Sequence, residues 1–290
     1  MKKIIERLLA FIIGIPAVYA LVILLPYRSN LALNIVTIFF SAMGAVEFSF
    51  LLEKKKIVIS KIESFILGAV IPLAFTLIFS FKELPEWIFP VLIMASAGWI
   101  LLTKVFAKSS EIEPITEQII GKFSLLVYPG LFICWLVIMS GWGDPGATLL
   151  FLFVTFSSDS VAWLFGSLFG KNNRGIIPVS PNKSIAGFIG GVLGSVIVAV
   201  GAAFLFPNIF VYLNLEIPSG KLAILAAILG LCTSIAASLG DLTESAIKRS
   251  CDSKDSGNLM LGRGGVLDSI DSIAVAAPVF YLLFNIFFRV

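Results

Sequence analysis

Histidine is absent from this 290-residue sequence, and cysteine and charged residues are scarce. Without an imidazole, the chain cannot use a histidine triad, a histidine general base or a histidine-ligated transition metal. The three cysteines, Cys134, Cys232 and Cys251, show no C-x-x-C spacing, so neither a zinc site nor a disulfide is expected. A bound metal would have to be held mainly by carboxylates, which favours a hard ion such as Mg²⁺.

Charged residues make up only 13% of the chain, whereas soluble proteins carry about 25%. Hydrophobic residues make up 58%, and the mean hydropathy is +1.02. Apolar runs near or above the ~18 residues that span a bilayer recur along the sequence. We therefore predict an all-α, polytopic integral membrane protein. The nine transmembrane spans that we predict lie at residues 8–26, 30–52, 65–82, 86–103, 124–140, 146–170, 185–206, 221–240 and 268–288.

The lysines and arginines predict the orientation of these spans. With the N-terminus in the cytoplasm, 17 of the 21 basic residues fall in cytoplasmic segments. This asymmetry follows the positive-inside rule. The net charge of +3 therefore reflects a basic cytoplasmic rim, which by itself implies no particular substrate. We expect membrane lipids, and no nucleic acid, as partners.

The two halves of the chain differ in character. Residues 1–145 form apolar spans with few polar interruptions, and we predict that they are a transmembrane scaffold. Residues 146–290 carry more polar groups and glycines, with predicted cytoplasmic loops at 171–184 and 241–267. The acidic residue Glu47 lies inside the second predicted span. We interpret it as structural, either near the membrane edge or hydrogen-bonded to a neighbouring helix.

Asp159 stands among three serines in FSSDSVAWLFGSLFGK, within the sixth predicted span. An ionisable residue inside a span is a candidate functional residue. The alternative is a structural aspartate that is hydrogen-bonded to those serines or caps a broken helix.

The polar turn SPNKS contains Ser180, Asn182 and Lys183 and leads into the seventh predicted span. Backbone N–H groups and the helix dipole at such an N-terminus attract anions, and Lys183 adds a full positive charge. A phosphate site fits this turn. The alternative is a polar turn that only obeys the positive-inside rule.

The densest charge lies in residues 238–272, SLGDLTESAIKRSCDSKDSGNLMLGRGGVLDSIDS. If 241–249 is helical, Asp241, Ser245 and Lys248 share one face. Asp268 and Asp271 follow at i, i+3 in the first turn of the ninth predicted helix, so both carboxylates can face one site.

Carboxylates beside lysine and arginine at a membrane edge are typical of metal-assisted phosphoryl or nucleotidyl transfer. In that chemistry a metal neutralises phosphate charge while the basic side chains hold the leaving pyrophosphate. The glycines of 262–265 would let backbone amides approach a phosphate. A solvated, salt-bridged loop is the alternative.

Three blocks of this sequence resemble the phosphatidate cytidylyltransferases, the CDP-diacylglycerol synthases. The run GDLTESAIKR…KDSG…G-x-G-G-V-L-D-x-I-D-S resembles the family signature, and SSDSVAWLFGSLFGK and SPNKSIAGFIGG resemble its other two blocks. The match covers about residues 157–272. It implies the reaction of CTP with phosphatidate to give CDP-diacylglycerol and pyrophosphate, with Mg²⁺ required. The lipid phosphate would attack the α-phosphorus of CTP directly, so no histidine base would be needed.

The resemblance also implies which residues form the site, within a catalytic region at 146–290. Asp241 and Asp268 would be metal ligands and, with Lys248, catalytic residues. Second-rank metal candidates are Asp159, Asp255 and Asp271. The residues expected to bind the triphosphate or phosphatidate are Ser180, Asn182, Lys183, Lys248, Arg249, Lys254, Arg263 and Gly264. The family further suggests a homodimer, in a bacterial inner membrane, with the active site facing the cytoplasm.

The sequence departs from the family pattern at Arg263 and Ser269. Where the family usually reads Pro-Gly-His-Gly-Gly, residues 261–265 read Leu-Gly-Arg-Gly-Gly. Where Asp-Arg-x-Asp is usual, residues 268–271 read Asp-Ser-Ile-Asp. Either Arg263 supplies the missing cation, or the protein is a weakly active or differently specialised relative.

Two other functions stay open on the sequence alone. One is a related CTP-dependent lipid enzyme, either a kinase of a polyprenol-type alcohol or another CDP-lipid synthase. The other is a cation transporter that uses Asp159. Transport sites normally lie near the bilayer midplane, whereas most acidic residues here gather at the predicted cytoplasmic edge, which favours an enzyme.

Overall fold

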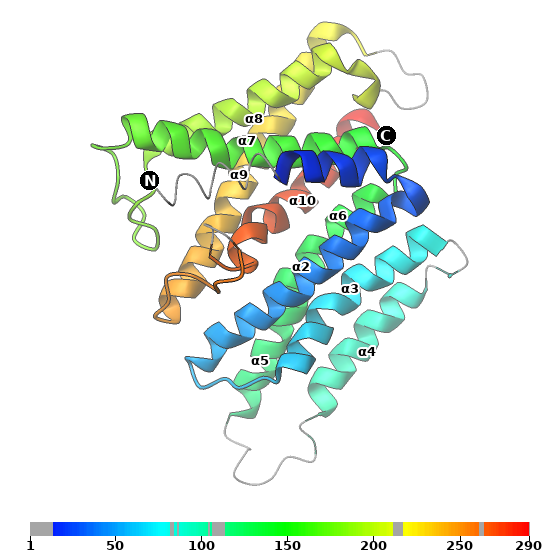
Figure 1. The fold of residues 1–290 in the computed structure, drawn as a ribbon, viewed down its shortest axis with the longest axis vertical. Coiled ribbons are helices and arrows are strands. Elements are labelled where there is room, and N and C mark those ends of the chain that lie inside the picture. Colours follow the sequence, from blue (N-terminus) through cyan, green and yellow to red (C-terminus); the bar gives the residue numbers. More distant parts are fainter. Residues whose placement is uncertain are drawn as a thin grey trace. The chain divides into compact units, whose positions relative to one another are not determined.

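The computed structural model describes residues 14–81, 84–85, 87–103, 105, 114–210, 217–260 and 264–289. Within these ranges the chain is helical, with two isolated β-bridges and no β-strand (Figure 1). The prediction of an all-α membrane protein is confirmed. The helices are η1 (Ala20–Leu24), α2 (Tyr27–Glu53), α3 (Lys61–Phe81), α4 (Ile88–Leu102), α5 (Ile115–Leu125), η3 (Leu126–Leu131), α6 (Phe132–Ser140), α7 (Pro145–Phe169), α8 (Ile185–Leu205), η4 (Pro207–Phe210), α9 (Ser219–Ser250) and α10 (Leu267–Phe288).

Seven helical segments of the described chain are long and apolar enough to cross a membrane. Two of the nine predicted spans, 8–26 and 86–103, coincide with shorter apolar helices at Gly14–Leu24 and Ile88–Leu102. The count of nine spans and the cytoplasmic N-terminus therefore stay predictions. The span predicted at 124–140 starts too late, because α5, η3 and α6 form one apolar segment, Ile115–Ser140.

The chain divides into two compact units, and helices α9 and α10 each contribute residues to both. Unit 1 comprises Met1–Gly143 and Ile247–Ile270, and unit 2 comprises Asp144–Ala246 and Asp271–Val290. The polar segment Ile247–Ile270 thus packs with the N-terminal helices, although it lies in the second half of the sequence.

Unit 1 is held together by close packing of α2 against α3, with α4 and α6 also against α3 (Figure 1). Gly68 of α3 lies so near to α2 that a Cβ there would be 2.6 Å from the Ala45 Cβ and 2.7 Å from the Ser41 carbonyl oxygen. The Ser41 hydroxyl lies 2.6 Å from the Gly68 carbonyl oxygen and 2.9 Å from the Pro129 carbonyl oxygen in η3. Absence of a side chain at Gly68 therefore sets the distance between the two helices.

Unit 2 is built on the pair α7 and α8, whose backbones also approach closely. A Cβ at Gly187 would be 2.9 Å from the Ala162 carbonyl oxygen, and one at Gly191 would be 3.0 Å from the Ser158 carbonyl oxygen. Small residues at such positions let membrane helices pack with their backbones in contact. Asp144 begins α7 as its N-cap and accepts a hydrogen bond from the Gly146 N–H at 2.9 Å.

Helix α9 is longer than a bilayer requires. Its 32 residues extend about 48 Å, whereas the hydrocarbon core is about 30 Å thick. The polar end of α9, residues 241–250, therefore reaches beyond the apolar part of the helix. Residues 241–250, the first part of the predicted cytoplasmic loop 241–267, are helical, as the expected shared face of Asp241, Ser245 and Lys248 requires. The described part of the loop that follows comprises 251–260 and 264–266.

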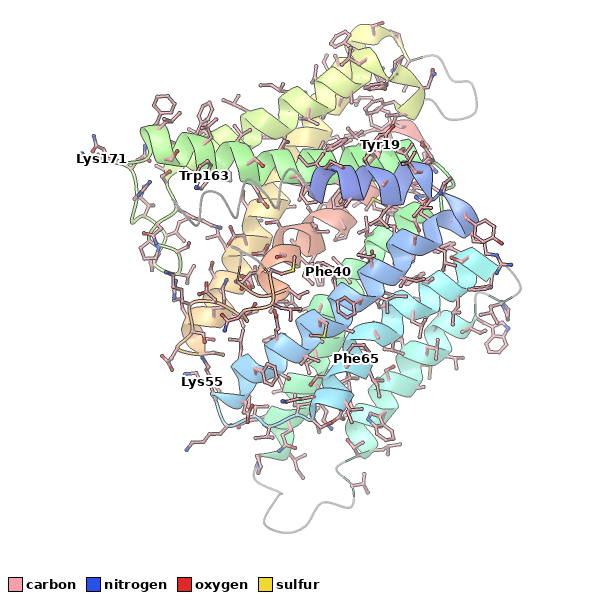
Figure 2. All side chains as sticks on the ribbon, in the orientation of Figure 1. Tyr19, Phe40, Lys55, Phe65, Trp163 and Lys171 are labelled. Carbon is pink, nitrogen blue, oxygen red and sulfur yellow. The ribbon has the colours of Figure 1, made fainter. Side chains whose placement is uncertain are left out.

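Large apolar side chains are exposed on the helices of both units (Figure 2). Phe65 of α3 is 40% exposed and Trp163 of α7 is 51% exposed. Contiguous apolar surface is unfavourable in water but favourable against lipid tails. This surface agrees with the membrane assignment.

We predict that Gly68→Ala destabilises the protein by about 1–3 kcal/mol, because the added methyl group overlaps α2. Thermal unfolding in detergent measures the effect. Gly98→Ala, on α4, is the matched control: no atom lies within 4 Å of a Cβ at that position. The control should leave the Tm unchanged or raise it, since alanine has the better helix propensity. Equal Tm changes for the two variants would contradict the packing described for α2 and α3.

Candidate active site

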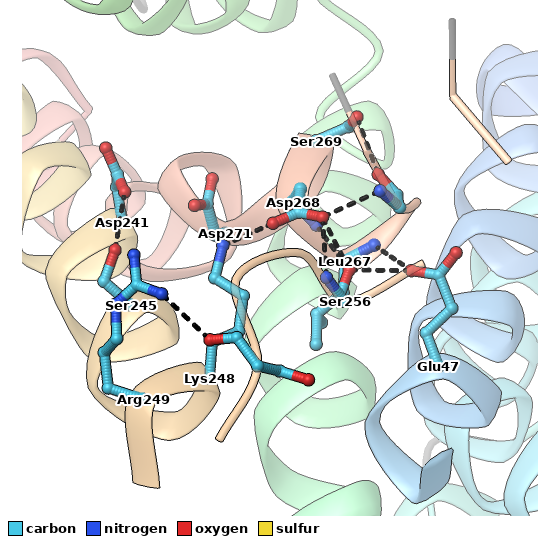
Figure 3. Close-up of polar contacts among 12 residues, drawn as sticks. Glu47, Asp241, Ser245, Lys248, Arg249, Ser256, Leu267, Asp268, Ser269 and Asp271 are labelled. Atoms are coloured by element: carbon cyan, nitrogen blue, oxygen red, sulfur yellow. Dashed lines mark hydrogen bonds and ion pairs between the residues drawn. The ribbon is translucent and has the colours of Figure 1, made fainter. Parts of the chain in front are cut away.

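In unit 1, the start of α10 is held by the carboxylate of Glu47 from α2 (Figure 3). Its Oε1 accepts a hydrogen bond from the Val266 N–H at 2.9 Å, and its Oε2 accepts one from the Leu267 N–H at 2.9 Å. The Ser256 hydroxyl also donates to Oε2, at 3.0 Å. The first N–H groups of a helix have no acceptor within the helix, and Glu47 supplies one. Glu47 is thus hydrogen-bonded to the start of a neighbouring helix, as one of the two structural interpretations expected, and also to the loop before it.

Asp268, in the first turn of α10, is the second carboxylate of this arrangement. Its Oδ2 accepts hydrogen bonds from the Gly265 N–H at 2.7 Å, the Ser256 N–H at 3.0 Å and the Ser256 hydroxyl at 2.8 Å. Its Oδ1 forms an ion pair with the ammonium of Lys248 from α9. The Asp268 and Lys248 side chains are 7% and 11% exposed. Two residues named from the family signature, Asp268 and Lys248, therefore form a largely buried ion pair, which the sequence did not predict.

The Ser256 hydroxyl lies between the two carboxylates. A hydroxyl has one proton, so it can donate to Glu47 or to Asp268 but not to both at once. Each carboxylate also accepts two backbone N–H groups, and it keeps these donors whichever way the hydroxyl points. The loop between α9 and α10 is thus bonded to these two acids at Ser256 and at its end, residues 265–266.

The other predicted residues of unit 1 lie on the same loop or at the end of α9. The Arg249 guanidinium donates to the Ser253 carbonyl oxygen at 3.0 Å. Lys254 and Asp255 are exposed. Gly264 has a φ of +99°, and a Cβ there would lie 2.6 Å from Asp268 Oδ2, so a glycine is required.

Of the two departures from the family signature, Arg263 and Ser269, the structure describes only Ser269. Arg263 lies outside the described residues, so both alternatives for it stay open. The Ser269 hydroxyl donates to the Gly265 carbonyl oxygen at 3.2 Å, one turn back along the chain. Ser269 therefore makes a local contact and supplies no positive charge.

In unit 2, the predicted acidic residues gather around Asp271. Asp241, Glu244 and Asp159 all lie close enough to Asp271 to repel it electrostatically. Asp271 itself is buried, and Asp159 accepts a hydrogen bond from the Ser272 hydroxyl at 3.3 Å. A cation bound near these acids would reduce the repulsion among them.

Asp241 already has a cationic partner in the same unit. Its carboxylate forms an ion pair with the Lys183 ammonium at 2.7 Å. The Ser245 hydroxyl donates to it at 3.4 Å (Figure 3), which confirms that these two residues share a helix face. This ion pair brings the sequence block SPNKS into contact with the block that begins at Asp241.

The predicted turn before α8 is confirmed. The Lys183 N–H donates to the Ser180 carbonyl oxygen at 3.0 Å, and Asn182 between them is exposed. Ser184 then begins α8 as its N-cap and accepts a hydrogen bond from the Gly187 N–H at 3.0 Å. Lys183 thus stands directly before a helix N-terminus, as an anion site requires. Phosphate binding by this turn stays a prediction.

The donor atoms of these acids suit Mg²⁺, although the described residues contain no group of three or more acidic or cysteine side chains placed to hold a metal. Mg²⁺ usually binds one or two carboxylates, and phosphate oxygens and water complete its shell. Asp241 and Asp268 offer such oxygens, each now paired with a lysine. The carboxylates therefore fit the ion, and the requirement for it stays a prediction.

Glu47 and Ser256 are the site residues that the sequence did not predict. Glu47 carried a signal, because an acidic residue within an apolar span is costly unless it has partners. Its partners lie 209 to 220 positions away, so no local pattern identifies them. No pattern marks Ser256.

Comparison with known proteins extends the similarity along nearly the whole chain. The profile of the Cytidylyltransferase family matches residues 5–287. Phosphatidate cytidylyltransferase of Bacillus subtilis is 33% identical over 258 residues, which are 87% of this chain and 89% of that protein. Phosphatidate cytidylyltransferase of Staphylococcus haemolyticus is 41% identical over 130 residues, 45% of each chain. Uncharacterized protein YnbB of Escherichia coli is 36% identical over 151 residues, 51% of this chain and 46% of that protein.

The Lys248–Asp268 pair predicts strong energetic coupling. Lys248→Met and Asp268→Asn should each destabilise the protein, and the double variant should lose about 1–3 kcal/mol less than the two single losses together. Thermal unfolding of the four proteins in detergent gives the coupling energy. Each single change leaves one buried polar partner without its counter-charge, whereas the double change removes both.

The exposed pair Lys55–Asp252, 3.1 Å apart on the same unit, is the control for this cycle. Its side chains are 45% and 86% exposed, so its coupling should stay below about 1 kcal/mol. Equal coupling in the two pairs would contradict the buried ion pair.

Proposed function

Because the chain belongs to the Cytidylyltransferase family, we propose that it converts CTP and phosphatidate into CDP-diacylglycerol and pyrophosphate. The observation that carries this proposal is the 33% identity to a phosphatidate cytidylyltransferase over 87% of the chain. The resemblance inferred from the three sequence blocks is confirmed and extends to the N-terminal spans. The protein is an integral membrane transferase of phospholipid biosynthesis.

The reaction has a simple atom balance. An oxygen of the phosphatidate phosphate bonds to the α-phosphorus of CTP, and the bond from that phosphorus to the α,β-bridging oxygen breaks. Pyrophosphate leaves with the bridging oxygen. The second pKa of a phosphate monoester is about 6, so the nucleophile is already anionic at neutral pH. No side chain has to remove a proton, which agrees with a chain that contains no histidine.

Lysines of both units are placed to bind phosphate oxygens. Lys248 and Lys183 each hold an aspartate in the structure, and a phosphate oxygen would compete for the same ammonium group. In the transition state such a group stabilises the negative charge that develops on the leaving pyrophosphate. Arg249 and the exposed Lys254 add positive charge beside Lys248.

We assign the metal to the acids named from the signature. Asp241 and Asp268 are the proposed Mg²⁺ ligands, with Asp159, Asp255 and Asp271 as second-rank candidates. Bound Mg²⁺ would neutralise phosphate charge and polarise the phosphorus under attack. Support for this assignment is the oxygen chemistry of the carboxylates and the gathering of acids around Asp271.

The substrates require a site at the membrane surface. CTP is soluble in water, whereas phosphatidate is confined to the bilayer. The polar end of α9 carries Lys248 and Arg249 beyond its apolar stretch, so these residues can meet both substrates. We place this surface on the cytoplasmic side of a bacterial inner membrane, which the distribution of basic residues favours. A homodimer is expected from the family resemblance alone.

The purified protein should form labelled CDP-diacylglycerol from phosphatidate and CTP labelled at the α-phosphorus, and should release one pyrophosphate per product. Removal of Mg²⁺ with a chelator should reduce the rate to background, because the cation would neutralise the negative charge of the triphosphate beside these carboxylates. Thin-layer chromatography of the lipid phase measures the product.

Three results would contradict this function. Transfer of the γ-phosphate of CTP to a polyprenol-type alcohol would indicate a kinase, and a CDP-lipid formed only from another phospholipid acid would indicate a different synthase. Metal flux into proteoliposomes without consumption of CTP would indicate a cation transporter.

A further inference from the structure

Glu47 is a buried carboxylate that the proposed reaction does not use directly. It lies in the last two turns of α2 and is 5% exposed. Placing a carboxylate in this position is costly, because a charged group loses water when it is buried. Its contacts show what it gains: two backbone N–H groups at the start of α10 and the hydroxyl of Ser256.

We propose that Glu47 is a positioning residue for cytidylyl transfer: its carboxylate fixes Ser256 and the first turn of α10, and so sets the position of Asp268 and of its partner Lys248. This inference rests on the proposed function for its effect on the reaction. The contacts themselves lie entirely within unit 1.

The loop is shaped to receive the Glu47 carboxylate. A Cβ at Gly257 would overlap Glu47 Oε1, and a Cβ at Gly265 would overlap Glu47 Oε2 and the Ser256 hydroxyl. Both glycines therefore let the backbone of the loop close around this side chain. Two independent points of the loop thus depend on the same carboxylate.

The first turn of α10 also packs on α2 close to Glu47. Gly44, one turn before Glu47, would place a Cβ 3.0 Å from Ile270 Cδ1 and 3.5 Å from Leu267 Cδ1. Apolar packing by itself fixes the distance between the two helices but not the rotation of α10 about its axis. The hydrogen bonds from Val266 and Leu267 to Glu47 fix that rotation, and with it the direction of the Asp268 side chain.

Ser256 and Gly265 connect the position of Glu47 to that of the Asp268 carboxylate. The Ser256 N–H and the Gly265 N–H both donate to Asp268 Oδ2, which leaves Oδ1 directed at Lys248, and the Ser256 hydroxyl donates to Glu47 or to Asp268. If Glu47 released Ser256 and the helix start, these donors would move, and the ion pair would lose its fixed geometry. Supporting residues of this kind typically change activity by about 10- to 100-fold when they are removed.

The test compares Glu47→Gln with Ser41→Ala, which lies on the same helix and does not touch the loop. Glutamine keeps the volume of Glu47 but turns a donor NH₂ group toward backbone donors. We expect kcat to fall about 10- to 100-fold while the KM for CTP changes by less than about threefold, because transition-state stabilisation is lost rather than ground-state binding. Ser41→Ala removes a buried hydroxyl that bonds α3 and η3, and should lower the Tm without this loss of kcat.

A second measurement does not depend on catalysis. Amide hydrogen exchange in the substrate-free protein should become about tenfold faster or more for peptides that cover 256–268 in Glu47→Gln, since each lost bond to a charged acceptor weakens protection. Exchange in α3 should stay unchanged. Gly257→Ala, which presses on Glu47 from the loop side, should reproduce both effects with Glu47 intact, and it replaces Glu47→Gln if that variant does not fold.

Unchanged exchange at 256–268, an unchanged kcat, or an equal loss of kcat in Ser41→Ala would overturn the proposal. If the unmodified protein forms no CDP-diacylglycerol, the proposed function fails instead. The exchange measurement still shows in that case whether Glu47 holds the loop.

Discussion

Two buried carboxylates at the start of α10 fix the polar loop of unit 1. Glu47 and Asp268 together accept four backbone N–H groups, and the Ser256 hydroxyl lies between them. A loop of 16 residues, 251–266, has large conformational freedom, and ordering it costs free energy for every residue. Hydrogen bonds to charged acceptors offset part of that cost. The Lys248–Asp268 ion pair depends on this arrangement, because Asp268 keeps one oxygen free of backbone donors and directs it at the ammonium.

The location of Glu47 and Asp268 at the ends of apolar helices explains why their carboxylates accept several hydrogen bonds from the protein. Polar groups that are buried at the end of a span lose their contacts with water, so they must find partners within the protein. Each unit contains a lysine–aspartate pair, which is largely buried for Lys248–Asp268 in unit 1 and partly exposed for Lys183–Asp241 in unit 2. Such pairs are also suited to phosphate chemistry. A phosphate oxygen can take the place of the carboxylate at the lysine, and the released carboxylate can then bind a metal ion.

The sequence predicted well what depends on neighbouring residues. The helical fold follows from long apolar runs, and the shared face of Asp241 and Ser245 follows from the period of the α-helix. The polar end of α9 was left open between helix and loop, because polar residues at the end of a long helix have the same composition as a loop. Glu47 was recognised as unusual, but its donors are more than 200 positions away and contact between such segments leaves no local pattern. The Lys248–Asp268 pairing needed the loop geometry, which the glycines at 257, 264 and 265 determine and which composition alone does not reveal.

The most direct test of the account is the turnover of Asp268→Asn against that of Asp252→Asn. Both variants remove one carboxylate charge from a lysine partner in unit 1, but the Asp268 side chain is largely buried in the first turn of α10 and Asp252 is exposed on the loop. With CTP and phosphatidate at saturating concentrations and Mg²⁺ present, kcat of Asp268→Asn should fall about 100-fold or more, while Asp252→Asn should retain the normal rate. A near-normal rate for a folded Asp268→Asn protein would contradict the assignment of this carboxylate to the reaction.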